Sequence, residues 1–126
     1  MKNYAALSSL SIAVAVICGA FGAHALRDAV PAGDLLIWEK AVLYHFIHGF
    51  GALLVATSLS SWISTRAASR ICTLLFLSTC VFSGSLYLLV LFNQRWLGMI
   101  TPLGGTGFIV AWLTLAVLLR RGPKGA

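Results

Sequence analysis

The stretch YHFIHGFG places His45 and His48 three positions apart among apolar residues. Two imidazoles at positions i and i+3 of a helix share one face, and neutral imidazole is a common metal ligand. With His24 as a partner from a facing helix, the pair could hold a transition metal or a haem. The same side chains could instead form hydrogen bonds between helices, with His48 or Tyr44 bonding a backbone carbonyl or Tyr87. We favour hydrogen bonding and assign no cofactor.

The composition of the chain identifies the elements that position these histidines. Of the 126 residues, 60% are hydrophobic and 10% are charged, and the mean hydropathy is +0.94. A soluble domain would need a more highly charged surface than this. Four apolar stretches, each close to the roughly 20 residues that span a bilayer, cover residues 4–26, 41–63, 71–92 and 102–119. We therefore predict an all-α membrane protein in which residues 1–126 form one integral domain, a compact bundle of four transmembrane helices.

The nine lysines and arginines are distributed unevenly between the two sides that four spans define. One side holds Lys2, Arg66, Arg70, Arg120, Arg121 and Lys124. The other side holds Arg27, Lys40 and Arg95, together with all three acidic residues. Because cytoplasmic segments carry the excess of basic residues, both termini are predicted to be cytoplasmic, in the inner (plasma) membrane of a bacterium. Basic residues at span ends indicate contact with lipid headgroups and not with nucleic acid.

Small residues recur along one face of the predicted helices. At about 100° per residue, His45, His48 and Gly49 fall on one stripe of the second span. The other spans carry glycines on comparable stripes, namely Gly19, Gly84, Gly104 and Gly107. Small residues at such spacing let membrane helices approach closely. These glycines are therefore predicted to lie at helix–helix contacts.

Most of the polar side chains within the spans are predicted to lie at one depth, in the outer half of the membrane. The predicted polar cluster comprises His24, Glu39, Tyr44, His45, His48, Tyr87 and Thr101. Polar residues inside a membrane are costly, so such a cluster is a candidate functional site. A carboxylate just above it could orient an imidazole. Thr101 also directly precedes Pro102, a pattern typical of a capped helix start.

The remaining residues of the spans favour neither an enzyme nor a transporter. Ser83 and Ser85 could suggest a nucleophile, but serine in membrane helices usually bonds the preceding turn. No carboxylate within a span would orient a catalytic base. The only proline in a span, Pro102, stands at a helix start, which does not indicate the broken helix of a substrate site.

Four motifs in order, GAFGAHAL, WEKAxxYHxxH, FSGSLYLL and ITPLGGTGF, together cover nearly the whole chain. In these motifs the chain resembles the YgdD-like family of small inner-membrane proteins of unknown function, which also has eukaryotic transmembrane relatives. The resemblance implies a four-span membrane protein and brings no reaction, cofactor or ligand. We therefore predict a small helper or accessory protein that packs against itself, as a homo-oligomer, or against a membrane protein partner. The alternative is a metal- or haem-binding membrane protein that uses His24, His45 and His48.

Overall fold

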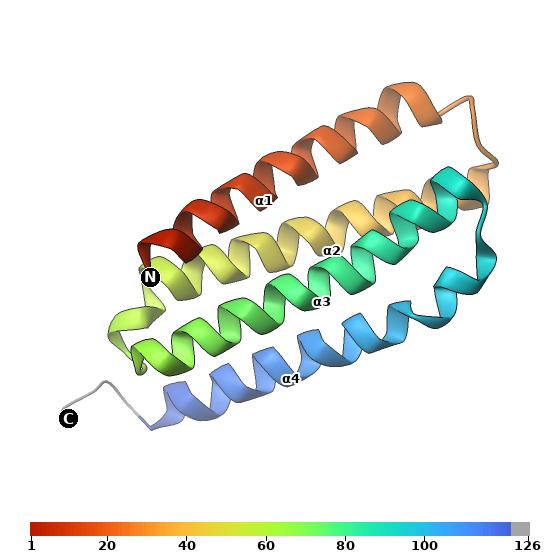
Figure 1. Ribbon diagram of the computed structural model, residues 1–126. Helices are drawn as coiled ribbons and strands as arrows, with labels where there is room; N and C mark the ends of the chain where they lie inside the picture. Colours follow the sequence, from red (N-terminus) through yellow and green to blue (C-terminus); the bar gives the residue numbers. More distant parts are fainter. Residues whose placement is uncertain (122–126) are drawn as a thin grey trace.

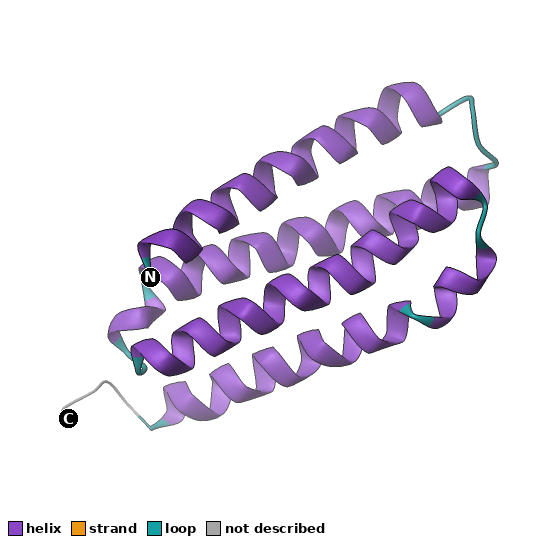
Figure 2. Cartoon of the chain, viewed as in Figure 1, coloured by secondary structure: helices purple, strands orange, loops and turns teal. Residues whose placement is uncertain are grey.

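The computed structural model describes residues 1–121 (Figure 1), so Lys124, counted above among the basic residues of the tail, lies outside the described residues. Four α-helices make up most of the described chain: α1 (Lys2–Phe21), α2 (Ala32–Thr57), α3 (Thr65–Phe92) and α4 (Thr101–Arg120). Three short helical segments accompany the connections: the π-helical η1 (Gly22–Leu26) and the 3-10 helices η2 (Leu59–Ser61) and η3 (Arg95–Met99). No strand occurs within residues 1–121 (Figure 2).

Successive helices run antiparallel and pack side by side, α1 on α2, α2 on α3 and α3 on α4 (Figure 1). The structure has four helices that are long and apolar enough to cross a membrane. The predicted fold class, an all-α compact bundle of four such helices, is therefore confirmed. The start of α1 and the end of α4 lie at the same end of the bundle.

Local sequence sets the helix boundaries. Pro31, with a ψ of 148°, cannot continue a helix and directly precedes α2. Ser64 caps α3, because its side chain accepts a hydrogen bond from the N–H of Ala67 at 3.1 Å. Asn93 ends α3 in the left-handed region, with a φ of 52°, which asparagine tolerates better than most residues. The chain therefore reverses direction where a proline, a serine cap or an asparagine permits it.

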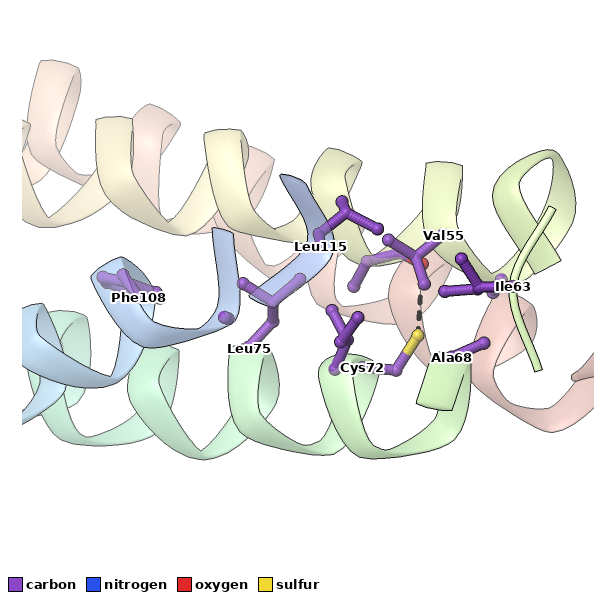
Figure 3. Packing of buried hydrophobic residues seen from close by; sticks show 11 residues of the cluster. Val55, Ile63, Ala68, Cys72, Leu75, Phe108 and Leu115 are labelled. Atoms are coloured by element: carbon purple, nitrogen blue, oxygen red, sulfur yellow. Dashed lines mark hydrogen bonds between the residues drawn. The ribbon is translucent and has the colours of Figure 1, made fainter. Parts of the chain in front are cut away.

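The main core lies where α2, α3 and α4 meet (Figure 3). Leu75 and Cys72 of α3 and Val55 of α2 are fully buried there. The Cys72 thiol donates to the carbonyl oxygen of Ala52 at 3.6 Å, so this cysteine packs as a small apolar group with a weak donor. Small side chains such as Ala52 let α2 and α3 approach closely.

Large apolar side chains cover the outer faces of all four helices. They include Leu10 and Ile17 of α1, Leu77 of α3, and Leu103 and Leu113 of α4, each more than half exposed. In water this much exposed apolar surface would be unfavourable, whereas hydrocarbon tails match it. The outer surface thus fits a lipid environment.

Candidate functional site

His45 lies at the junction of three helices. It is only 8% exposed, and its Nε2 atom is 3.0 Å from the hydroxyl of Ser11 on α1. Its Nδ1 atom is 3.2 Å from the hydroxyl of Tyr87 on α3. A neutral imidazole has one donor and one acceptor nitrogen, so the ring donates one of these bonds and accepts the other. His45 thereby links α2 to both α1 and α3 and uses both of its nitrogens.

His48 lies one turn further along α2 and contacts a different helix. Its Nδ1–H donates to the carbonyl oxygen of Tyr44, one turn back on the same helix, at 2.7 Å. Its ring stacks on Phe108 of α4, with centroids 3.3 Å apart and planes 12° apart. The interhelical hydrogen bond to Tyr87 that we considered for His48 or Tyr44 is instead made by His45.

His24 and Glu39 lie apart from these buried side chains. His24 is part of η1 and is exposed, and Glu39 is exposed on α2. Within residues 1–121, no three His, Cys, Asp or Glu side chains gather in a way that could hold a metal ion. The metal- or haem-binding set of His24, His45 and His48 stays a prediction.

Thr101, a further member of the predicted polar cluster, and two serines outside it form separate contacts between helices. The Thr101 and Ser85 hydroxyls lie 2.7 Å apart and link α4 to α3. Ser83 donates to the carbonyl oxygen of Ala41 at 2.8 Å and links α3 to α2. The expectation that Thr101 caps α4 is wrong, because the capping position is Ile100 and the Thr101 hydroxyl bonds Ser85 instead.

The five predicted packing glycines differ in how closely a neighbouring helix approaches them. A Cβ on Gly104 would lie 2.5 Å from the backbone nitrogen of Phe82, and one on Gly107 would collide with the Ser78 side chain. On α2 and α1, the corresponding distances are 3.1 Å from Gly49 to Ile12 and 3.4 Å from Gly19 to Val42. A Cβ on Gly84 would meet nothing within 4 Å. Among these five sites, the closest approach is therefore the one between α3 and α4.

Sequence reasoning missed the contact between the η1 segment and α2. A Cβ on Gly22 would lie 2.5 Å from the ring of Trp38, so only glycine leaves room for this indole. The indole N–H donates to the carbonyl oxygen of Cys18 at 2.8 Å, and the ring lies 4.6 Å from that of Tyr87. The glycines of GAFGAHAL were the available signal for this contact.

An ion pair at the same end of the bundle was also missed. The two terminal guanidinium nitrogens of Arg95 in η3, Nη1 and Nη2, donate to the two carboxylate oxygens of Asp34, at 2.6 and 2.8 Å. The Asp34 side chain is 11% exposed and that of Arg95 is 55% exposed. The pair fastens the beginning of α2 to the connection between α3 and α4. No spacing in the sequence pointed to it, since the residues stand 61 positions apart.

Comparisons with known proteins agree with this architecture. Residues 18–105 match a family described as "Protein of unknown function (DUF423)". The chain is 43% identical over 117 residues to a UPF0382 membrane protein of Staphylococcus saprophyticus, an alignment that covers 93% of this chain and 96% of the relative. It is 37% identical over 117 residues to the UPF0382 membrane protein YwdK of Bacillus subtilis, covering 93% and 95%. The chain belongs to this family of membrane proteins. No solved structure matches the chain.

The residues that match the family can be located in the structure. Residues 18–105 include α2, α3 and both connections at the end where Asp34 and Arg95 meet. They contain His45, His48 and Tyr87, whereas Ser11 and most of α4 fall outside. The segment that identifies this DUF423 protein thus contains the whole of the helix that carries both buried histidines.

Proposed function

We propose that this protein is a small accessory protein that acts through the outer faces of its helices, by packing against a second copy or another membrane protein. The proposal rests on the polar groups in the interior of the bundle, which bond one another. Every fully buried side-chain nitrogen or oxygen within residues 1–121 has a hydrogen-bond partner. Bonds from His45, Ser83 and Thr101 hold neighbouring helices together. Because the interior is used for packing, contact with other molecules falls to the outer faces.

The outer face of α1 is the best place for such a contact. Small exposed side chains fall on one narrow stripe at about 100° per residue: Ala6, Ser9, Ala13 and Ala20. Leu10 and Ile17, which are 62% and 66% exposed, lie beside the stripe. Small residues between larger ones let a second transmembrane helix approach closely and pack. A helix from another copy or from a partner would fit this face.

The test compares Ala13→Leu with Val14→Leu, a neighbouring exposed position that lies off the stripe. The leucine at position 13 should block the approach of the second helix, whereas the leucine at position 14 should be neutral. Native mass spectrometry in mild detergent reports self-association, and cross-linking in the native membrane reports partners. We expect Ala13→Leu alone to lose the assembly. A monomeric wild type that cross-links to no membrane protein would contradict the proposal.

Several finer assignments are part of the same proposal. We further propose that residues 1–126 form one integral domain of the bacterial inner membrane, with both termini in the cytoplasm. The resemblance to the YgdD-like family, which also has eukaryotic relatives, supports the placement in a membrane. The split of six basic residues against three supports the orientation. Labelling of single cysteines should place positions 64 and 124 in the cytoplasm and position 34 outside. Labelling of positions 34 and 124 from the same side would refute the topology.

The metal- or haem-binding alternative is tested separately. His45 already uses both ring nitrogens within the protein, and His24 is exposed in η1, so the structure favours the packing proposal. A visible absorption spectrum and metal analysis of the purified protein distinguish the two. A stoichiometric metal or haem that is lost in His48→Gln would favour the alternative.

A further inference from the structure

A groove of about 420 Å³ opens on the outer surface between α2 and α4. Its aromatic lining consists of Tyr44, His48, Phe82, Phe108 and Trp112. Gly105, Ile109 and Leu113 of α4 complete it, and the last two are 60% and 62% exposed. Because these exposed apolar side chains would face lipid, the groove is accessible from within the bilayer.

Two polar groups in this groove have no hydrogen-bond partner within residues 1–121. One is the Nε2 atom of His48, since the only bond of this ring is the one from Nδ1 to the Tyr44 carbonyl. The other is the hydroxyl of Tyr44, whose ring lies 5.6 Å from that of His48. Every fully buried polar atom of the described chain is paired, so both of these atoms reach the surface of the groove. His48 as a whole is only 5% exposed.

The position of these groups makes their unpaired state costly. Tyr44 and His48 lie in the middle of α2, a helix long and apolar enough to span the membrane. The hydrocarbon interior holds no water that could bond them, and an unsatisfied polar group there costs free energy. A ligand that enters the groove from the bilayer and bonds both groups would remove that cost.

We propose that this groove binds the head group of a membrane-soluble quinol. The protonation of His48 favours a ligand that donates a hydrogen bond. A charged imidazole is costly in hydrocarbon, so the ring is neutral, and its only proton on nitrogen lies on Nδ1 and is donated to Tyr44. The Nε2 atom is therefore an acceptor and needs a ligand that donates. A quinol hydroxyl donates to it, whereas a quinone has no hydroxyl to donate.

The lining suits a flat ring with a second oxygen. The rings of Tyr44, Phe82, Phe108 and Trp112 line the groove, and another aromatic ring can pack against them. The Tyr44 hydroxyl can donate to or accept from the second quinol oxygen. The isoprenoid tail would leave past Ile109 and Leu113 into the lipid. The proposal concerns binding and is independent of any self-association through α1.

The experiment measures binding of decylubiquinol to the purified full-length protein in lipid nanodiscs, by thermal shift and by titration of tryptophan fluorescence. Three variants are compared with wild type: Tyr44→Phe, His48→Asn and Tyr4→Phe. Tyr44→Phe removes only the unpaired hydroxyl, so the fold is retained. His48→Asn keeps a donor near the Nδ1 position and removes the Nε2 acceptor. Tyr4→Phe is the matched control, because Tyr4 bonds Thr73 between α1 and α3, outside the groove.

We expect saturable binding of decylubiquinol to wild type and weaker binding of decylubiquinone. Tyr44→Phe should weaken quinol binding by about threefold to tenfold, the usual effect of losing one hydrogen bond, and His48→Asn should weaken it at least as much. Tyr4→Phe should bind like wild type. Absence of saturable binding to folded wild type, or equal affinities in Tyr44→Phe and wild type, would overturn the proposal. So would a dimer whose contact, mapped by cross-linking at Ile109, covers the groove.

Discussion

His45 and His48 stand three residues apart on one helix, yet their surroundings differ in kind. His45 is held from two sides, with a hydroxyl of α1 on one nitrogen and a hydroxyl of α3 on the other. His48 bonds only its own helix and offers its second nitrogen to a groove beside α4. The first imidazole is a structural bridge, and the second is open to an outside molecule. In a membrane helix, the neighbours on each face therefore decide the role of a histidine.

The α3–α4 contact decides how the second histidine is presented. Phe108, which stacks on His48, belongs to the helix that Gly104 and Gly107 bring against α3. The ring of Trp112 likewise packs against Gly51, where a Cβ would lie only 2.6 Å from the indole. The rings that surround His48 thus depend on glycines for their positions, whereas His45 is itself held by hydrogen bonds.

The largest expected effect comes from Gly104→Leu. This change should disrupt the contact between α3 and α4 beside His48 and leave the contacts of His45 intact. Its Cβ would lie 2.5 Å from the Phe82 backbone nitrogen and 2.8 Å from the Ser78 carbonyl, and backbone atoms cannot move aside. We expect a loss of about 3 kcal/mol in the free energy of unfolding, near the top of the range for overpacking. Gly84→Leu is the control, because a Cβ at that site meets nothing within 4 Å. Unfolding by SDS titration measures both, and equal losses would disprove the close approach at Gly104.

The next effect compares His45→Leu with His48→Leu. The first leaves the part-buried hydroxyls of both Ser11 and Tyr87 without their shared partner and should cost about 2 kcal/mol, within the range for polar groups that lose their partner. The second removes a bond to a carbonyl of its own helix and the stacking on Phe108, which leucine replaces by apolar contact, so its cost should be smaller by about 1 kcal/mol. The same SDS titration gives both values. A larger loss for His48→Leu would reverse the roles assigned to the two histidines.

Much of the architecture could be predicted from the sequence, because long apolar stretches mark the membrane spans. Four apolar stretches and their spacing predicted the four-helix bundle, which is confirmed. Hydropathy did not mark the start of the second helix, however. The apolar stretch begins at residue 41, but α2 begins at Ala32, because a helix can start with polar residues at the end of a bundle. Asp34, in that first turn, is neutralised by Arg95.

The side-chain contacts of the site were harder to predict from the sequence, because they depend on the relative rotation of the helices. Periodicity placed His45 and His48 on one stripe, but they lie about 300° apart around the helix, or 60° by the shorter way, so two different neighbours face them. No spacing within α2 shows that α1 supplies Ser11 or that α4 supplies Phe108. Trp38 is a further residue whose contacts could not be predicted, because a tryptophan can either anchor a helix at the membrane interface or pack between two helices. The close contact at Gly22 and the bond from the indole N–H to the Cys18 carbonyl distinguish them.

The smallest expected effect is also the sharpest test of the difference between the two sides, because each change removes a single oxygen. Tyr87→Phe removes the hydroxyl bonded to His45, whereas Tyr44→Phe removes a hydroxyl without a partner in the described chain. Hydrogen bonds between membrane helices average about 0.6 kcal/mol, so Tyr87→Phe should lower the free energy of unfolding by about that much. Tyr44→Phe should leave it unchanged or raise it slightly, because an unpaired hydroxyl in hydrocarbon contributes no stability. Repeated SDS titrations of both variants beside wild type, without added quinol, resolve the sign of each change. If Tyr44→Phe were the more destabilising of the two, its hydroxyl would have a partner in the folded protein, and the open character of the His48 side would have to be abandoned.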